Sequence, residues 1–178
     1  MAIKLPELKK KAKKIKLLIV DVDGVLTDGK IIFDSTQREI KAFDVKDGHG
    51  IKAAHRFGLE VAIITGRSSS IVDQRASELG IKTVIQKALD KKSAFNKILE
   101  STKLSAEEIA YIGDDLPDLP VLRRVGLSVA VSDAVQEVLE SADMVTKRYG
   151  GSGAVREVID FILKAQGKWD TLMERYYA

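Results

Sequence analysis

The chain has 178 residues, of which 45% are hydrophobic, 31% charged and 6% aromatic, and it contains no cysteine. A chain of this length buries enough apolar surface to fold as one domain without a disulfide or a structural metal. The lack of cysteine excludes thiol nucleophiles, thiolate metal sites and redox switches.

The net charge of +3 is distributed unevenly along the chain. Residues 1–16 hold seven Lys and one Glu, which contribute +6, so the rest of the chain carries −3. The chain therefore lacks the basic stripe with interleaved aromatic residues that is typical of nucleic-acid binders. No apolar stretch approaches the ~18 residues of a membrane span, and no signal-peptide core follows the basic start. We expect a cytoplasmic protein with no nucleic-acid partner and no membrane contact, whose basic N-terminal helix, residues 1–15, packs on the domain.

Six short apolar runs end in turns rich in Gly or Asp, which predicts strands buried on both faces of a sheet. The expected strands are residues 16–20, 60–64, 83–85, 109–112, 127–130 and 144–145. Stretches with helical periodicity lie between and after them, at residues 49–57, 68–79, 90–101, 117–124, 134–140 and 152–166. This alternation predicts an α/β fold, a doubly wound, Rossmann-like parallel sheet with helices on both faces, in a single domain over residues 1–178.

Two segments depart from the alternation. Residues 30–33 and 39–43 flank a turn-like stretch, which predicts a β-hairpin over residues 30–43 that projects just after the first strand. Residues 150–178 are expected to form a C-terminal helix and tail, with the glycine-rich residues 150–153 as a flexible hinge. The aromatic residues near the end are either part of a disordered tail or anchors at a subunit interface.

Polar side chains follow several of the predicted strands. Asp21, Asp23, Thr65 and Asp114 all stand where a strand ends, and ligand sites of open parallel sheets lie outside the carboxyl ends of the strands. Because Asp21 and Asp23 are two residues apart, extended backbone points both carboxylates to one side. Two such charges favour a bound cation, and with a further carboxylate from GDDLPD at 113–118 they form a ligand set that suits Mg²⁺.

These motifs occur together and in a fixed order. DVDGVLTDG (residues 21–29), ITGR (64–67), Lys91 and GDDLPD (113–118) resemble the four motifs of the haloacid dehalogenase superfamily of phosphotransferases. The resemblance covers the chain from about Lys16 onward. It implies the α/β fold already predicted and a phosphoryl transfer that depends on positioning and electrostatics.

The resemblance also implies a role for each motif residue. Asp21 is expected to attack phosphorus and to become an aspartyl phosphate, while Asp23 protonates the leaving oxygen and later activates water. An acid at position 23 favours a phosphatase over a dehalogenase. Thr65 and Lys91 are expected to contact the phosphoryl oxygens. Mg²⁺ is expected at the Asp21 side chain, the Asp23 backbone carbonyl and Asp114, with support from Asp115 and Asp118.

Members of this superfamily usually carry a cap domain over the site, and the chain has no room for one. Only 41 residues separate Asp23 from Thr65, and the hairpin and one helix take up most of them. A site open to water must be closed by another part of the assembly, for which a second subunit is the simplest source. We therefore expect a homo-oligomer without a cap domain.

Finer features resemble one capless family, the 3-deoxy-D-manno-octulosonate 8-phosphate phosphatases of lipopolysaccharide biosynthesis. They are residues 21–29, KAFDVKDG at 41–48, VGLSVAVSDA at 125–134 and the tail GGSGAVREVIDFILKAQGKWD at 150–170. The resemblance implies a tetramer in which the hairpin makes the central contacts and the tail reaches a neighbouring site. It also implies a sugar acid phosphate substrate, with contacts from Asp23, Asp44, Val45, Lys46, Asp47, Gly48, Lys52, Arg67, Arg75 and Lys91.

Three alternatives stay open at this point. The substrate can be another sugar acid phosphate, such as a 9-phosphate of sialic acid or of its deaminated relative KDN. A receiver-like signalling domain also forms an aspartyl phosphate, but it places the phosphorylated Asp on a middle strand, whereas here the first strand carries both Asp21 and Asp23. A catalytically silent binding module is expected to have lost Asp21, Asp23, Lys91 or Asp114, and the chain keeps all four.

Overall fold

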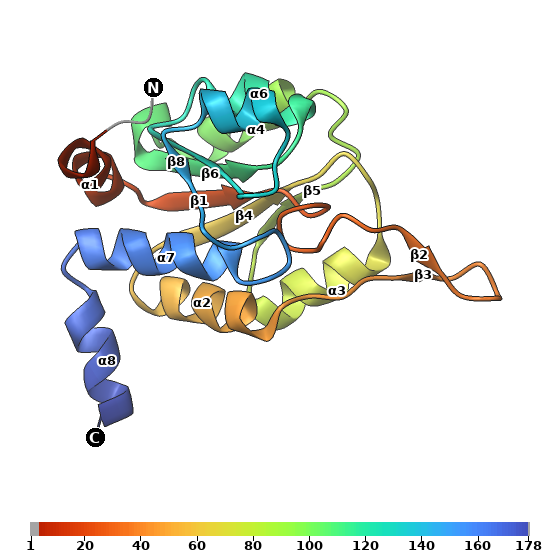
Figure 1. Ribbon diagram of the computed structural model, residues 1–178, viewed down its shortest axis with the longest axis horizontal. Coiled ribbons are helices and arrows are strands. Elements are labelled where there is room, and N and C mark those ends of the chain that lie inside the picture. Colours follow the sequence, from red (N-terminus) through yellow and green to blue (C-terminus); the bar gives the residue numbers. More distant parts are fainter. Residues whose placement is uncertain (1–3, 178) are drawn as a thin grey trace.

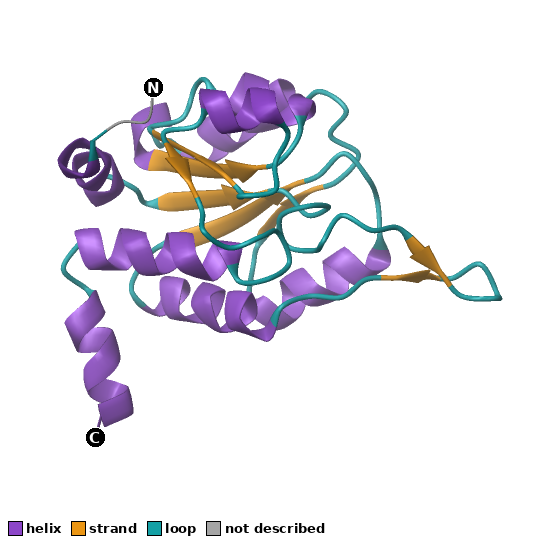
Figure 2. Cartoon of the chain, viewed as in Figure 1, coloured by secondary structure: helices purple, strands orange, loops and turns teal. Residues whose placement is uncertain are grey.

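The computed structural model describes residues 4–177 and shows a six-stranded sheet between two layers of helices (Figures 1 and 2). All six strands are parallel, which confirms the predicted α/β fold. Their bounds are β1 Leu17–Val20, β4 Glu60–Ile64, β5 Thr83–Ile85, β6 Ile109–Gly113, β7 Leu127–Ala130 and β8 Met144–Val145. Each lies within one residue of its predicted position.

The order of the strands locates the functional edge of the sheet. It is β5-β4-β1-β6-β7-β8, with Leu17 of β1 paired to Glu60 of β4 on one side and to Ile109 of β6 on the other. Counted along the chain without the hairpin, this is the 3-2-1-4-5-6 order of Rossmann folds, and not the 2-1-3-4-5 order of receiver domains. The order reverses between β1 and β6, so a ligand crevice is expected at their carboxyl ends.

Helices cover both faces of the sheet (Figure 1). One layer contains α2 Val45–Arg56, α3 Ser70–Leu79 and α7 Ala154–Ala165, and the other contains α4 Lys91–Thr102, α5 Leu119–Leu122 and α6 Gln136–Ser141. Two short 3₁₀ turns, η1 Ala106–Glu108 and η2 Leu116–Asp118, precede β6 and α5. Among the helices of residues 4–177, none is long and apolar enough to cross a membrane.

Helix α2 begins four residues before its predicted start at residue 49. Asp44 caps it by accepting a hydrogen bond from the backbone N–H of Lys46 at 2.5 Å, and anionic caps stabilise helix N-termini. Two glycines in its first turns weaken the helical pattern in the sequence. The close approach of α7 explains why a glycine occupies position 50, since a Cβ there would lie 2.9 Å from Cδ of Arg156 on α7. The glycine therefore permits close packing of α2 against α7.

Helix α7 is part of the core. Val155, Val158, Ile159 and Ile162 follow the helical repeat and have no exposed surface, and each such side chain contributes about 1.5–3 kcal/mol when fully buried. The preceding glycines do not form the predicted flexible hinge. Gly150 is buried, and a Cβ there would lie 1.8 Å from the carbonyl oxygen of Gly24. The glycines instead let this loop pack against the loop that follows β1.

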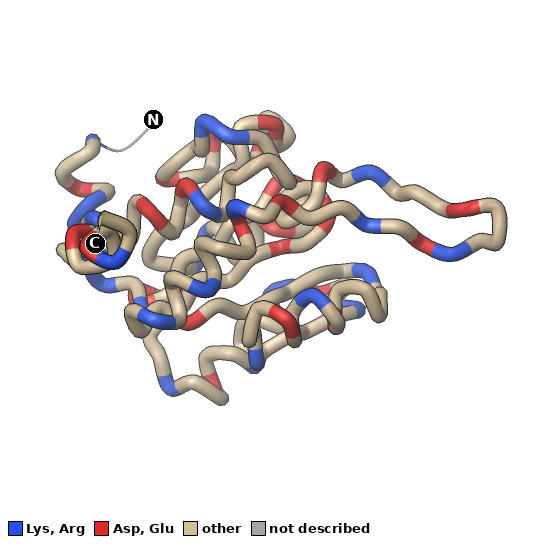
Figure 3. Tube along the Cα trace, turned by 90° about the horizontal axis from the view of Figure 1, so that it is seen from below, with Lys and Arg blue, Asp and Glu red and all other residues tan. Residues whose placement is uncertain are grey.

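The predicted hairpin is formed by β2 Ile32–Phe33 and β3 Glu39–Ile40, paired antiparallel with Ile32 opposite Ile40. It projects from the body of the molecule, and acidic and basic residues alternate along it (Figures 1 and 3). The Asp34 carboxylate closes its turn by accepting hydrogen bonds from the backbone N–H groups of Thr36 and Arg38, at 2.8 and 2.9 Å. Four apolar side chains on it are about half exposed: Ile31, Ile32, Phe33 and Ile40.

The two ends of the chain form one helix each. The helix predicted at residues 1–15 is observed as α1, Leu5–Lys13, and residues 1–3 of that range lie outside the described residues. It packs against α7, and Lys11 forms an ion pair of 2.6 Å with Asp143. The tail contains a further helix, α8 Trp169–Tyr177, which the sequence did not predict.

Candidate active site

The predicted strand-end residues converge on one pocket. Asp21, Thr65 and Asp114 directly follow β1, β4 and β6, which are neighbours in the sheet. They line a pocket of about 270 Å³ at the switch point of the strand order. The full lining is Asp21, Asp23, Thr65, Gly66, Arg67, Ala88, Leu89, Lys91, Asp114, Asp115, Pro117 and Asp118.

A tight loop after β1 presents the two aspartates. The carbonyl oxygen of Val22 accepts hydrogen bonds from the N–H groups of Val25, Leu26 and Thr27 at 3.0–3.2 Å, so the chain turns at once. Asp21 and Asp23 line the pocket, whereas Val22 between them is fully buried and does not line it, in agreement with the predicted alternation. At the turn, Gly24 has φ +90°, and a Cβ there would lie 2.1 Å from Asp114 Oδ2. Only glycine lets this backbone approach Asp114 so closely.

Lys91 lies between two buried carboxylates. Its Nζ is 2.9 Å from Asp21 Oδ2 and 2.5 Å from Asp118 Oδ1, and its side chain is 5% exposed. Burial lowers the pKa of Lys91, but the charges of Asp21 and Asp118 outweigh burial and raise it above its usual value. Lys91 therefore carries a positive charge beside Asp21, where it can stabilise added negative charge.

Asp118 is fully buried, and both of its oxygens have partners. Oδ1 accepts hydrogen bonds from Lys91 and from the hydroxyl of Tyr111, each at 2.5 Å. Oδ2 accepts from the backbone N–H groups of Asp114 and Asp115, at 3.0 and 3.2 Å. Asp118 thus fixes the loop after β6 and the position of Lys91. Tyr111 was not predicted as a site residue, because within an apolar strand its hydroxyl gives no sign of its partner.

Asp21 and Asp114 each have an oxygen without a partner. Oδ1 of both residues is buried and accepts no hydrogen bond from the described residues. Burial raises the pKa of Asp21 to about 6, against the opposing effect of Lys91, and burial together with Asp21 and Asp118 raises that of Asp114 to about 8. Buried anions of this kind favour a bound cation. Asp21, Asp114 and Asp118 also each offer an oxygen within 4.8 Å of the other two. The donor set therefore fits Mg²⁺, with Asp21 and Asp114 offering the free oxygens.

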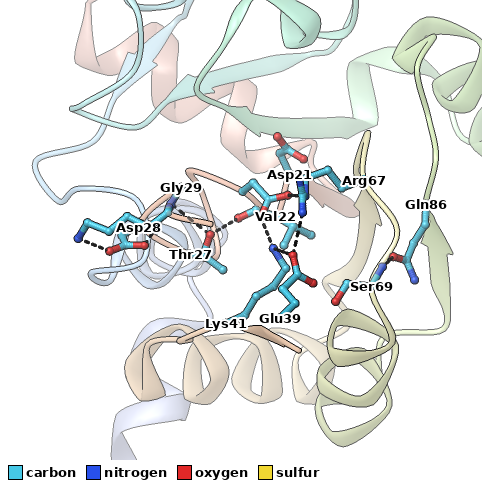
Figure 4. Close-up of polar contacts among 12 residues, drawn as sticks. Asp21, Val22, Thr27, Asp28, Gly29, Glu39, Lys41, Arg67, Ser69 and Gln86 are labelled. Carbon is cyan, nitrogen blue, oxygen red and sulfur yellow. Dashed lines mark hydrogen bonds and ion pairs between the residues drawn. The ribbon is translucent and has the colours of Figure 1, made fainter. Parts of the chain in front are cut away.

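Asp23 is held from the other side by the hairpin, whose residues Glu39 and Lys41 are labelled in Figure 4. Lys41, just after β3, forms an ion pair with Asp23 Oδ1, and Arg67 Nε lies 3.7 Å from Asp23 Oδ2. Glu39 of β3 lies 2.9 Å from Arg67 Nη2 and 3.5 Å from Lys41 Nζ. No site role was predicted for Glu39 or Lys41, because charged residues of a hairpin resemble a solvated surface in the sequence.

The structure divides the predicted substrate contacts into two groups. Asp23, Arg67 and Lys91 line the pocket. The other group lies on the first turns of α2 and on α3 and does not line that pocket, and its members are Asp44, Val45, Lys46, Asp47, Gly48, Lys52 and Arg75. Asp115 is exposed at the rim, where its side chain accepts a hydrogen bond from the N–H of Leu116 at 2.7 Å.

Asp47 lies at the contact between α2 and α7. It is 1% exposed, and its Oδ1 accepts a hydrogen bond of 2.7 Å from the N–H of Arg156 in the first turn of α7. A carboxylate at a helix N-terminus stabilises the free N–H groups there. The other oxygen, Oδ2, is buried and has no hydrogen-bond partner among the described residues. Asp47 therefore holds α2 against α7 through Oδ1, and its contact with a substrate stays a prediction.

Three comparisons relate the chain to known proteins. The sequence profile of the haloacid dehalogenase-like hydrolases matches residues 82–159. The 3-deoxy-D-manno-octulosonate 8-phosphate phosphatase KdsC of Escherichia coli strain K12 is 51% identical over 160 residues, which are 90% of this chain and 85% of that one. The same enzyme from Moraxella catarrhalis, solved with magnesium, phosphate and the KDO molecule, is 44% identical and superimposes with a TM-score of 0.95 over 97% of this chain and 99% of that one.

Proposed function

Because the chain belongs to the 3-deoxy-D-manno-octulosonate 8-phosphate phosphatases, a family of haloacid dehalogenase-like hydrolases, we propose that the pocket around Asp21 hydrolyses this sugar acid phosphate with Mg²⁺ as cofactor. The products are the free sugar acid and phosphate, and the reaction is a step of lipopolysaccharide biosynthesis. One observation carries the proposal, which is that Asp21 is oriented by Lys91 through Oδ2 while its Oδ1 stays free beside Asp114.

In the first half of the reaction, an Asp21 oxygen attacks phosphorus. The new bond forms as the bond between phosphorus and the ester oxygen breaks, and the electron pair of that bond moves to the ester oxygen. Asp23 donates its proton to this oxygen, which leaves as the hydroxyl of the sugar acid. Lys91 and Thr65, which is 2% exposed in the pocket wall, are positioned to stabilise the charge on the transferring phosphoryl group.

In the second half, water hydrolyses the aspartyl phosphate. Asp23, now a carboxylate, takes a proton from the water as the water oxygen attacks phosphorus. The bond between phosphorus and Asp21 breaks, and phosphate leaves. When bound, Mg²⁺ supplies charge neutralisation to the phosphoryl oxygens, and Asp21, Asp114 and the backbone carbonyl of Asp23 would hold it. Asp118 and Asp115 support the loop that carries Asp114.

The test is phosphate release from a panel of phosphate esters, with Mg²⁺ and with a chelator. The panel contains 3-deoxy-D-manno-octulosonate 8-phosphate, a sialic acid 9-phosphate, the KDN 9-phosphate, a hexose phosphate and an aryl phosphate. We expect a Mg²⁺-dependent preference for the eight-carbon acid. A preference for a nine-carbon acid would keep the chemistry and change the substrate, and no release at all would contradict the proposal.

Asp21→Asn identifies the pocket as the site of this activity. The amide has the same shape but cannot act as the nucleophile, so turnover should fall at least about 10³-fold while the melting temperature changes little. Glu100→Gln, at an exposed position near the end of α4 and outside the pocket, is the matched control with unchanged activity. Full activity in the Asp21 variant would place the reaction elsewhere.

The proposal includes a homo-oligomer, which is supported by the open pocket and by the exposed apolar side chains of the hairpin, such as Ile32 and Phe33. A tetramer is what the resemblance to the phosphatase family implies. A neighbouring subunit would close the pocket, and it could bring the substrate contacts expected at Asp44–Gly48, Lys52 and Arg75 over it. Entry of the tail into a neighbouring site and a cytoplasmic location stay predictions of the sequence.

A further inference from the structure

The base of the hairpin contains a buried lysine. The side chain of Lys41 is 2% exposed, whereas Ile40, one residue earlier, is an exposed residue. Lysine is rarely buried without a partner, because desolvating an ammonium group is costly. The partners here are Asp23 Oδ1 and, at 3.5 Å, Glu39 Oε1.

Lys41 belongs to a network of two cations and two anions. The other members are Arg67, Glu39 and Asp23, of which Figure 4 labels Arg67 and Glu39. Glu39 contacts both cations, at 2.9 Å from Arg67 and 3.5 Å from Lys41. Hydrogen bonds from Ser69 and Arg67 lower the pKa of Glu39, so that it remains an anion at neutral pH. Glu39 therefore holds Lys41 and Arg67 against Asp23 from outside the pocket.

The two oxygens of Asp23 are held unequally. Oδ1 is in direct contact with the buried Lys41, while Oδ2 lies 3.7 Å from the half-exposed Arg67, which is longer than a hydrogen bond. We propose that Lys41 is a positioning residue, which fixes the Asp23 carboxyl group by Oδ1 and leaves Oδ2 facing the pocket to exchange the proton. The proposal rests on the proposed function, because it assigns the orientation of its acid and base.

The proton balance follows from this arrangement. Oδ2 of Asp23 carries the proton before phosphoryl transfer and gives it to the ester oxygen as the bond between that oxygen and phosphorus breaks. Asp23 is then a carboxylate facing Lys41. Oδ2 later takes a proton from the attacking water, which restores the acid. Lys41 keeps its own protons throughout and touches neither substrate nor phosphate, so it acts through Asp23 alone.

The dependence of the reaction rate on the leaving group distinguishes positioning of Asp23 from support of the fold and from binding of the substrate carboxylate. An alkoxide such as that of a sugar needs a proton from Asp23 to leave, phenolate needs it less, and p-nitrophenolate hardly needs it. The quantity to compare is kcat/KM, because it covers the steps up to departure of the first product and excludes hydrolysis of the aspartyl phosphate. The variant is Lys41→Met, and the matched control is Lys30→Met, which removes an exposed charge from the same hairpin.

For Lys41→Met we expect kcat/KM to fall about 10- to 100-fold on 3-deoxy-D-manno-octulosonate 8-phosphate, part of what an acid catalyst supplies, and less than about threefold on p-nitrophenyl phosphate. Phenyl phosphate should lie between them. Lys30→Met should match the wild type on all three substrates. If Lys41→Met does not fold, as judged by its melting curve, Glu39→Gln tests the same network and should show the same order of losses with smaller amplitude.

Other outcomes would overturn the proposal. Equal losses on all three substrates would mean that Lys41 supports the fold or the assembly. A loss on the sugar acid phosphate with no difference between the two aryl phosphates would mean that Lys41 binds the substrate carboxylate, since neither aryl phosphate carries one. A wild type that hydrolyses aryl phosphates but no sugar acid phosphate would contradict the proposed substrate, while the aryl pair would still decide the role of Lys41.

Discussion

At the residue scale, the acidic side chains of the pocket differ in how many partners they have. Asp118 accepts two hydrogen bonds at each oxygen and has no exposed surface, so its position is fixed by the fold. Asp21 and Asp114 keep one free oxygen each. Satisfied buried carboxylates are typical of structural positions, and unsatisfied ones point to ligands. This contrast supports the proposed roles, in which Asp118 is a structural support and Asp21 and Asp114 bind the cation and the phosphoryl group.

Asp47 makes the stability of the protein depend on pH. Burial raises its pKa from 3.8 to about 6, although the hydrogen bond from the backbone N–H of Arg156 opposes the rise. Between these two values the folded state holds a proton that the unfolded state has released. The contribution of Asp47 to stability is therefore fully present below pH 4 and is lost as the pH rises to about 6.

Asp47→Asn should remove that dependence. The free energy of unfolding of the wild type, relative to the Asn variant, should fall by at most about 3 kcal/mol between pH 4 and pH 6 and stay constant above. Urea unfolding of both proteins at several pH values measures the difference, in which groups common to both cancel. Asp170→Asn, at an exposed position, should show no such trend. A constant difference for Asp47→Asn would mean that its carboxyl titrates normally.

The predicted residues that meet in the pocket share a local signature. Asp21, Thr65 and Asp114 end apolar runs, and that position alone places them at one edge of a parallel sheet. Lys41 and Tyr111 were not predicted, because their roles depend on partners that only the folded chain brings near. A lysine in a polar hairpin and a tyrosine in an apolar strand have ordinary surface and core interpretations.

At the scale of elements, the two C-terminal helices differ in what holds them. Helix α7 buries six side chains in the core, and α8 buries only Leu172. Helix α8 contacts α2 near its end, where the hydroxyl of Tyr176 lies 2.8 Å from Nε2 of His49. The sequence predicted α7 from its strong apolar repeat, whereas α8 follows a glycine and its apolar positions are few. The strength of the local apolar pattern therefore explains why α7 was predicted and α8 was not.

Two truncations separate the roles of these helices. Removal of residues 150–178 deletes α7 and should prevent folding, since the buried side chains of α7 contribute about 1.5–3 kcal/mol each. Removal of residues 169–178 deletes only α8 and should cost about 1–3 kcal/mol, chiefly the burial of Leu172. Thermal melting and turnover of both truncations are the measurements. If the tail serves a neighbouring site, turnover of the shorter truncation falls far more than its stability, and unchanged turnover would contradict that prediction.

At the scale of the whole molecule, the hairpin is the feature that a single chain does not stabilise well. A two-stranded ribbon is marginal by itself in water, and both its edges carry unpaired backbone groups. Apolar side chains at Ile31, Ile32, Phe33 and Ile40 are about half exposed on it. Further copies of the chain could cover this surface and the open pocket together. The short, alternating pattern of residues predicted the hairpin. The surface that would cover its apolar side chains cannot be predicted from the sequence of the hairpin alone.

A charge placed on the hairpin tests this assembly. Phe33→Lys should shift the protein to a smaller species in light scattering after size exclusion, because burial of an unpaired ammonium at an interface is costly. Ser35→Lys, at the exposed turn of the same hairpin, should leave the assembly intact. A wild type that runs as a monomer, or a Phe33 variant of unchanged mass, would contradict an assembly built on the hairpin.

The central position of β1 affects how the protein is made. Strand β1 is the first strand to leave the ribosome, and both of its neighbours in the sheet, β4 and β6, are synthesised later. At the usual rates of translation, β6 follows β1 after roughly 5–20 s. Throughout that interval a nascent chain holds an apolar strand with an open edge, which is the kind of segment that chaperones bind. Because Asp114 emerges last among the carboxylates with a free oxygen, no half-synthesised chain can bind the metal or release phosphate.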